Sequence, residues 1–249
     1  MTFEDLTIAL PAPKPVVLSE AALFLDLDGT LAPIAARPQD VRPDARRTRL
    51  VEQLNAALDG RLAVVSGRTL ADVDRILEGR VTSVAAVHGL VRREPDGTVH
   101  ESAPHPDLPL AAERFRDFAA RDSGFIVEEK GLSVALHYRL AKPHAAAARR
   151  LADEIAEQTG LTLQHGDMVE ELRTPGPTKG DSVMSFLSQA PFRGFQPVFV
   201  GDDATDEHGF QAVQQAGGVG VLVGASRESA ATFRLLGVEE VLDWLEAAL

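Results

Sequence analysis

A short apolar run that ends in two aspartates constrains the fold of this chain more than any other stretch. Residues 21–25 read Ala-Ala-Leu-Phe-Leu, and Asp26, Leu27, Asp28 and Gly29 follow directly. An apolar run without polar alternation is typical of a strand buried on both faces, as in a parallel sheet. Strand periodicity places both aspartates on one side, and Gly29 lets the backbone turn. We therefore expect two carboxylates at the carboxyl end of a central strand, where open α/β sheets bind ligands.

Apolar runs alternate with amphipathic segments at both ends of the chain, an order typical of a parallel sheet. The expected strands of this sheet are residues 21–28, 62–65, 84–87, 197–200 and 219–223. The expected helices are residues 44–58, 70–77, 179–189 and 206–216, followed by two more helices that close the chain.

The middle of the chain has a different pattern. A hairpin at residues 90–101 and a proline-rich linker precede a helix, two strands, a second helix and two more strands. Such a segment is typical of a small α+β layer inserted into a larger domain. We therefore expect a Rossmann-like α/β core, residues 1–104 and 173–249, with an inserted α+β cap at residues 105–172.

Charge and composition exclude several classes of protein. The formal net charge is −12 and no basic cluster is present, so nucleic acid is not an expected partner. The chain has no cysteine, which excludes thiolate catalysis and cysteine-ligated zinc. The first ten residues carry Glu4 and Asp5 and no long apolar block follows, so we expect neither a signal peptide nor a membrane span. These features predict a cytoplasmic protein with a small-molecule ligand.

Polar groups that are far apart in the sequence converge on one edge of the expected sheet. They end strands or begin a helix, and they are Asp26 and Asp28, Ser66, Lys179, and Asp202 and Asp203. The carboxyl ends of parallel strands share one edge of the sheet, so we expect these side chains to form one site.

Such a site has the groups that cleavage of a phosphate ester requires. Mg²⁺ prefers hard oxygen ligands, which Asp26, Asp202 and the backbone carbonyl of Asp28 offer. The Asp28 carboxyl suits proton transfer to the leaving oxygen and from the attacking water. Ser66 and its neighbouring amides suit phosphoryl oxygens. Lys179 at a helix start adds positive charge and orients Asp26.

Other polar residues near these motifs have more than one interpretation. Arg68 is either a surface residue or a substrate contact. His88 is either a turn histidine bonded to backbone or a site residue. His137 alternates with apolar residues, so it either contacts substrate or faces one side of the cap sheet. Asp206 and Glu207 either support the site or stabilise the first turn of a helix.

The motifs resemble those of the haloacid dehalogenase superfamily and, within it, the trehalose-6-phosphate phosphatase family. The resemblance runs from about Leu23 to the last helix. It rests on DLDGTLAPI, the Ser-Gly-Arg at 66–68, VEEKGLSVALHYR, VEELRTPGPTKG, GDDATDEHGF and GVGVLVG. Thr174 departs from the family pattern, which usually has proline at this position.

The resemblance implies Mg²⁺-dependent hydrolysis of trehalose 6-phosphate, the last step of trehalose biosynthesis, through an aspartyl-phosphate. Asp26 would be the nucleophile and Asp28 the acid/base. Asp26, Asp28 and Asp202 would hold Mg²⁺, with support from Asp203 and Asp206. The cap would supply specificity, and its sugar contacts by motif position would be Glu128, Lys130, Arg139 and Glu171. A trehalose-6-phosphate synthase is the expected functional partner.

Three alternatives share part of this pattern. A phosphatase for sucrose or mannosyl phosphates would have the same core motifs, and only the cap stretch favours trehalose. A non-catalytic partner of a trehalose synthase would have lost a catalytic group, whereas this chain keeps Asp26, Asp28, Lys179 and Asp202. A nucleotide-binding module would need a glycine-rich phosphate loop after a strand, and the sequence has none.

Overall fold

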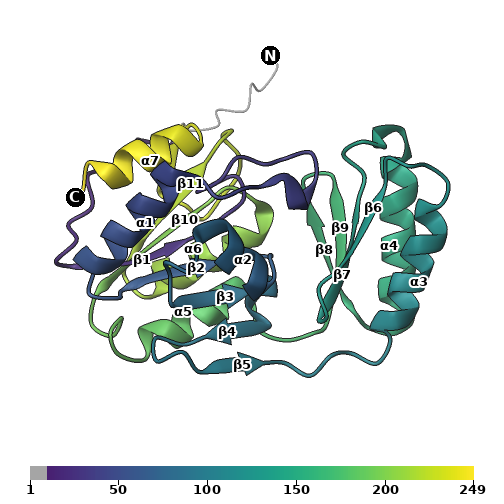
Figure 1. The fold of residues 1–249 in the computed structure, drawn as a ribbon, viewed down its shortest axis with the longest axis horizontal. Coiled ribbons are helices and arrows are strands. Elements are labelled where there is room, and N and C mark those ends of the chain that lie inside the picture. The colour runs from purple at the N-terminus through teal and green to yellow at the C-terminus, as the bar shows by residue number, and fades with distance from the viewer. Residues whose placement is uncertain (1–9) are drawn as a thin grey trace, which may run out of the picture.

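The computed structural model describes residues 10–249, which form two sheets with their helices (Figure 1). The larger sheet has eight strands within these residues, in the order β12-β11-β10-β1-β2-β3-β4-β5. Their bounds are β1 Ala21–Leu25, β2 Leu62–Val65, β3 Ser83–Ala86, β4 Val91–Arg93, β5 Val99–Glu101, β10 Gln196–Gly201, β11 Val219–Val223 and β12 Phe233–Leu235. Strands β12 to β3 are parallel, and the hairpin β4–β5 adds an antiparallel edge.

Strand β1 is central because its side chains are apolar on both faces. Leu23 and Leu25 face one layer of helices, whereas Ala22 and Phe24 face the other. The first layer contains α1 Ala45–Ala57, α2 Leu70–Leu77 and α7 Val238–Glu246; the second contains α5 Lys179–Leu187 and α6 Glu207–Gln215. We call this unit the core. Coverage on both faces leaves the carboxyl edge of the sheet as the place for polar groups.

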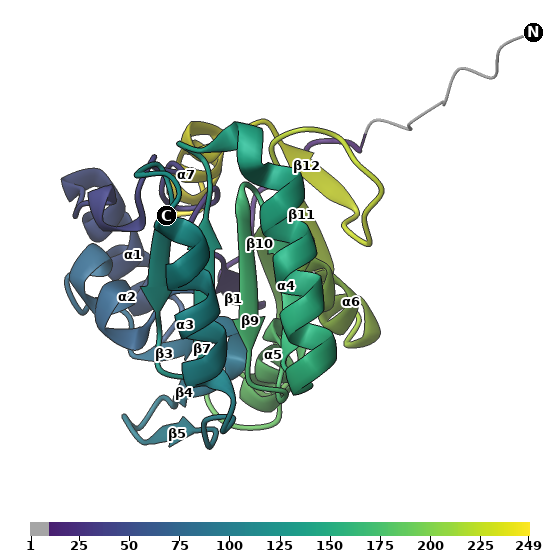
Figure 2. The same ribbon diagram turned by 90° about the vertical axis from the view of Figure 1, so that its right-hand side faces the viewer.

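The smaller unit, which we call the cap, runs from α3 to β9. Its antiparallel sheet has the order β6-β7-β9-β8. The elements are α3 Leu108–Ala119, β6 Ile126–Glu129, β7 Ser133–His137, α4 Ala145–Thr159, β8 Thr162–Gly166 and β9 Val169–Arg173. Both helices pack on the outer face of the sheet, in front of it in Figure 2. The other face is therefore turned toward the core.

The chain crosses between the two units twice, and the crossings are joined to each other. The amide of His105 donates to the Thr174 hydroxyl over 3.0 Å, and the amide of Thr174 donates to the Leu132 carbonyl over 2.9 Å. Proline has no amide hydrogen and could not make the second bond. At this position, where the family usually has proline, the Thr174 hydroxyl ties the entry segment to the exit segment, and the Thr174 amide ties the exit segment to the residue before β7.

The expected α/β core with an inserted cap is confirmed, and most predicted elements match within a few residues. The prediction of two closing helices is wrong, because the chain ends with strand β12 and helix α7. Phe233 and Leu235 pair with Val221 and Val223 of β11, so a distant partner stabilises a strand too short to show its own pattern. The expectation about the leader falls partly on residues 1–9, which lie outside the described residues. No helix in residues 10–249 is both long and apolar enough to cross a membrane.

Candidate active site

One pocket lies between the carboxyl edge of the core sheet and the open face of the cap. Every side chain that the sequence analysis assigned to catalysis, metal or substrate lines it, and so does Asp203; only Asp206 does not. The core contributes Asp26, Asp28, Ser66, Arg68, His88, Lys179, Asp202 and Asp203, and the cap contributes Glu128, Lys130, His137, Arg139 and Glu171. The predicted convergence of these side chains is therefore a property of the fold.

Lys179 links Asp26, which lines this pocket, to the buried Asp206. Its ammonium donates to Oδ1 of Asp26 over 2.8 Å and to Oδ1 of Asp206 over 2.7 Å. Lys179 is the first residue of α5, and a capping box between Thr178 and Asp181 fixes the start of that helix. Burial opposes the charge, but the two carboxylates outweigh it and raise the pKa of Lys179. The ammonium therefore stays charged and fixed beside Asp26.

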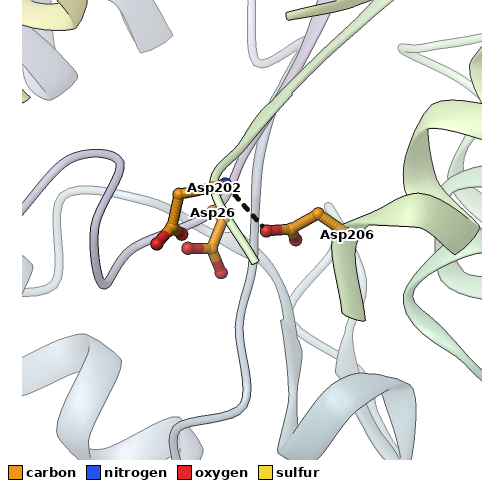
Figure 3. A group of neighbouring side chains, drawn as sticks. All are labelled: Asp26, Asp202 and Asp206. Carbon is orange, nitrogen blue, oxygen red and sulfur yellow. Dashed lines mark hydrogen bonds between the residues drawn. The ribbon is translucent and has the colours of Figure 1, made fainter. Parts of the chain in front are cut away.

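Asp206 uses both of its oxygens inside the protein. Oδ1 accepts from Lys179, whereas Oδ2 accepts from the amides of Asp202 and Asp203, each over 3.0 Å. The amide of Asp202 and this carboxylate are joined by the dashed line in Figure 3. Asp206 is fully buried and does not reach the pocket. Asp206 thus supports the loop after β10. Its bond with the Asp203 amide also closes the capping box of the short helix at Ala204–Asp206, so both predicted interpretations hold.

Asp202 lies beside Asp26, and one of its carboxylate oxygens makes no hydrogen bond within the described residues. Carboxylate oxygens of Asp26, Asp202 and Asp206 lie within 4.8 Å of one another. Oδ1 of Asp202 is buried and finds no hydrogen-bond partner in residues 10–249. The Asp202 carboxylate also needs Gly29, because a Cβ there would lie 2.0 Å from Oδ2 of Asp202. The close approach is possible because Gly29 has no Cβ, and glycine also adopts the φ of +83° there without strain.

The electrostatics of these carboxylates fit a hard divalent cation. Burial and the neighbouring Asp206 raise the pKa of Asp202 to about 8. Burial, with Asp206 and Asp202, raises the pKa of Asp26 well above its usual value, although Lys179 opposes the shift. A divalent cation between the two carboxylates would offset this repulsion, and carboxylate oxygens are ligands that Mg²⁺ prefers. Because both Asp206 oxygens are engaged, the side chains that fit the cation are Asp26 and Asp202.

Asp28 is held by a buried arginine. Nε and one terminal nitrogen of Arg68 each donate to a different Asp28 oxygen over 2.7 Å, and the other terminal nitrogen donates to the Pro38 carbonyl. Such a two-point pair fixes the carboxylate plane as well as its position. Arg68 is only 7% exposed, so its interpretation as a surface residue is wrong. The Asp28 carboxylate therefore bonds Arg68 and is not part of the cluster of Asp26, Asp202 and Asp206. That the backbone carbonyl of Asp28 is a metal ligand stays a prediction.

The cap side of the pocket is built from paired charges. Glu171 accepts from Lys130 over 2.8 Å and from the Ser133 hydroxyl over 2.6 Å. Burial alone would raise the pKa of Glu171, but Lys130 and His88 hold that pKa well below its usual value. His137 lies 2.8 Å from Glu128 on the neighbouring strand. Burial would also raise the pKa of Glu128, but His137 and Lys130 lower it, so both carboxylates are ionised acceptors at neutral pH.

Two polar residues of the cap site were not predicted. Ser133 bonds Glu171, and Asp167 lines the pocket and accepts from Arg139 over 2.9 Å. Ser133 shares a strand face with His137 because the two are four residues apart on β7, so strand periodicity was a usable signal. Asp167 sits in the turn between β8 and β9, where no periodicity applies.

The family model and a similar protein of known name both point to trehalose-phosphatases. The family model described as trehalose-phosphatase matches residues 24–239. The chain is 37% identical over 238 residues to the trehalose-6-phosphate phosphatase of Escherichia coli (strain K12), which covers 93% of this chain and 88% of that protein.

Solved structures agree with the fold. A trehalose-6-phosphate phosphatase related protein superposes with a TM-score of 0.76 at 28% identity, covering 90% of this chain and 95% of that one. A phosphatase of the HAD superfamily from Bacteroides thetaiotaomicron superposes with a TM-score of 0.59 at 16% identity, covering 90% and 92%. The second likeness concerns the fold alone.

Proposed function

Because the chain belongs to the trehalose-phosphatase family, we propose that it hydrolyses trehalose 6-phosphate to trehalose and phosphate, with Mg²⁺ and through an aspartyl-phosphate. It is a phosphatase with the α/β core and cap of the HAD superfamily. The observation that carries the proposal is the bridge from Lys179 to Asp26 at the edge of a pocket that also holds Asp28 and Asp202.

In the first step Asp26 attacks phosphorus. A bond forms between an Asp26 oxygen and phosphorus while the bond from phosphorus to the sugar oxygen breaks. Asp28, with one carboxyl oxygen protonated and released from Arg68, gives its proton to that oxygen, and trehalose leaves. Lys179 keeps Asp26 in position, because its ammonium lies 2.8 Å from one of the Asp26 oxygens.

In the second step water attacks the same phosphorus. Asp28 accepts a proton from the water as the new bond forms, and the bond from Asp26 to phosphorus breaks. Phosphate leaves, and Asp26 is a free carboxylate again. Ser66 and the amides that follow it suit the phosphoryl oxygens in both steps. Asp26 and Asp202 would hold Mg²⁺, which when bound offsets the repulsion between the nucleophile and the phosphoryl oxygens.

The two units divide the work in this proposal. The core, residues 1–104 and 173–249, carries the phosphate chemistry. The cap, residues 105–172, supplies Glu128, Lys130, His137, Arg139 and Glu171 toward the sugar, whose hydroxyl groups pair with carboxylates and cations. Arg68 completes the substrate contacts from the core. Pairing with a trehalose-6-phosphate synthase belongs to the proposal, since such a synthase makes the substrate, and a cytoplasmic location stays a prediction.

The test is phosphate release from a panel of substrates. The panel holds trehalose 6-phosphate, sucrose 6-phosphate, glucose 6-phosphate and 4-nitrophenyl phosphate, each with Mg²⁺ and with EDTA. We expect a strong preference for trehalose 6-phosphate that EDTA abolishes and added Mg²⁺ restores. Preference for another sugar phosphate would show that the proposed substrate is wrong. Activity in EDTA would show that the reaction does not depend on Mg²⁺. No phosphate release by the folded protein would favour the non-catalytic partner of a trehalose synthase.

A further inference from the structure

The turn that follows β3 has an unusual backbone. Val87, His88 and Gly89 all have positive φ, at 46°, 57° and 105°. Positive φ is rare for residues with a side chain, and for a β-branched residue such as Val87 it is a genuine outlier. Strained conformations persist where the surrounding structure determines them, and they cluster at functional sites. The strain in this turn therefore points to a role beyond folding.

The turn braces the loop that contains Ser66. The amide of His88 donates to the Ser66 carbonyl over 3.0 Å, and the amide of Val87 donates to the Arg68 carbonyl over 2.8 Å. The imidazole of His88 lies directly against Gly67, where a Cβ would come within 2.4 Å of Nε2. The strained turn thus brings the His88 ring over the loop proposed to bind phosphate.

One edge of the ring faces the cap. Nε2 of His88 lies 3.4 Å from Oε2 of Glu171. Lys130 donates to the same oxygen and also to the Gly67 carbonyl, over 3.0 Å. His88 is therefore a core residue placed among the cap side chains proposed to bind the sugar.

The two ring nitrogens have different surroundings. Burial lowers the pKa of His88, and Glu171 opposes the shift only in part, so the ring is neutral at pH 7. A neutral imidazole has one donor and one acceptor, and beside a carboxylate the hydrogen belongs on Nε2. Nδ1 is then a bare acceptor. It is buried and has no partner in the part of the chain that the structure describes, residues 10–249, although His88 lines the pocket.

We propose that His88 is a sugar-recognition residue contributed by the core: its Nε2–H holds Glu171 in place, and its Nδ1 accepts a hydrogen bond from a hydroxyl group of the sugar. The inference rests on the proposed function and adds a residue outside the cap to its substrate contacts. A hydroxyl at Nδ1 would satisfy a buried acceptor that is otherwise left unpaired.

The experiment removes each nitrogen separately. His88→Gln places an amide near the position of Nε2 and removes Nδ1, whereas His88→Asn places an amide near Nδ1 and removes the contact with Glu171. Asparagine tolerates the left-handed backbone well. His100→Asn, at an exposed position on β5, is the matched control. Each protein is assayed with Mg²⁺ on trehalose 6-phosphate and on 4-nitrophenyl phosphate, which has no sugar.

We expect both His88 variants to lower the ratio of kcat/KM for trehalose 6-phosphate to that for 4-nitrophenyl phosphate by about tenfold, through a higher KM, as loss of one hydrogen bond predicts. Inhibition by free trehalose should weaken in parallel. An unchanged ratio, or equal losses on both substrates, would overturn the proposal. If only His88→Gln lowered the ratio, Nε2 would have no role in sugar recognition. If only His88→Asn lowered it, Nδ1 would have none. The wild type reports on the proposed function independently, since its own substrate preference does not depend on His88 variants.

Discussion

Asp206 organises the site without entering it. Its two oxygens accept from the Lys179 ammonium and from two loop amides; the bond to Lys179 is buried, and the bonds to the amides are partly buried. A buried carboxylate of this kind fixes a lysine and a loop in one geometry. Asp26 and Asp202 are therefore already aligned before a substrate binds. Gly201 has no room for a Cβ because Asp206 lies 2.4 Å from that position.

Replacing Asp206 by alanine should lower the free energy of unfolding by about 3–5 kcal/mol, because it leaves a buried cation with one partner fewer and two amides with none. Asp206→Asn should cost less, since the amide oxygen still accepts. Urea unfolding measures both, and Asp117→Ala on the exposed side of α3 is the matched control. A loss below about 1 kcal/mol for Asp206→Ala would contradict the prediction.

Asp26→Asn should reduce turnover of trehalose 6-phosphate by at least about a thousandfold, because the amide is a poor nucleophile and the variant cannot form the acyl phosphate. The shape of the side chain is kept, so the unfolding transition should remain cooperative. Phosphate release under saturating Mg²⁺ measures the effect. Full turnover by the folded variant would show that Asp26 is not the nucleophile.

The turn at residues 87–89 and the loop at 66–68 are fitted to each other, and Gly67 is the residue at their contact. A methyl group on Gly67 meets the His88 ring at 2.4 Å, so either the ring or the loop must move. Gly67→Ala should lower stability by about 1–3 kcal/mol and kcat/KM by at least about tenfold, since small displacements of a phosphate-binding loop are costly. Gly237→Ala, with open space around its Cβ and an extended φ, is the control. Wild-type kinetics in Gly67→Ala would contradict this fit.

Glu171 on β9 contacts His88 of the core, and its charge should make the stability of the protein depend on pH. The pKa of Glu171 is held well below its usual 4.5, so the ionised group stabilises the fold above that pH. This stabilisation is lost as the pH falls from 4.5 toward the folded-state pKa.

Glu171→Gln should therefore lower the free energy of unfolding by about 1–3 kcal/mol at pH 7, and the difference from wild type should shrink below pH 4.5. Urea unfolding at a series of pH values measures it, with Glu113→Gln on the exposed face of α3 as the control. A difference that stays constant with pH would show that the Glu171 charge does not stabilise the fold.

Local patterns predicted the elements that carry their own signal. The helix expected at residues 70–77 is one of them: α2 has the same bounds, and the Thr69 hydroxyl caps it by accepting from the Asp72 amide. The polar strand ends converge because a parallel sheet requires it. Strand β12 was missed because pairing with β11, and not its own three residues, stabilises it.

The site shows the same limit. Asp26, Asp28, Lys179 and Asp202 sit in motifs at element ends and were predicted to meet. The partners of Asp28 and Glu171 were not, because Arg68 and His88 reach them through side-chain directions and a left-handed turn that no local pattern specifies. The sequence alone left both residues with two interpretations.

The charge of the molecule works against its proposed substrate. The chain carries a formal charge of −12, and carboxylates outnumber cations among the side chains that line the pocket. At saturating Mg²⁺, kcat/KM for trehalose 6-phosphate should therefore rise severalfold as ionic strength increases from about 0.01 M to about 0.15 M, because salt screens the repulsion. Steady-state kinetics in a chloride salt measures it, and a fall with added salt would show that the cations at the site outweigh the net charge.

The two crossings between core and cap lie next to each other, so the cap is a unit that could be exchanged. The cap enters and leaves through neighbouring segments, so a foreign cap could be grafted there without disturbing the parallel sheet. The graft would still have to match its host, because Lys130 bonds the Gly67 carbonyl and Glu171 lies against His88. A chimaera with a new sugar preference would thus inherit two constraints from the core, which was left unchanged.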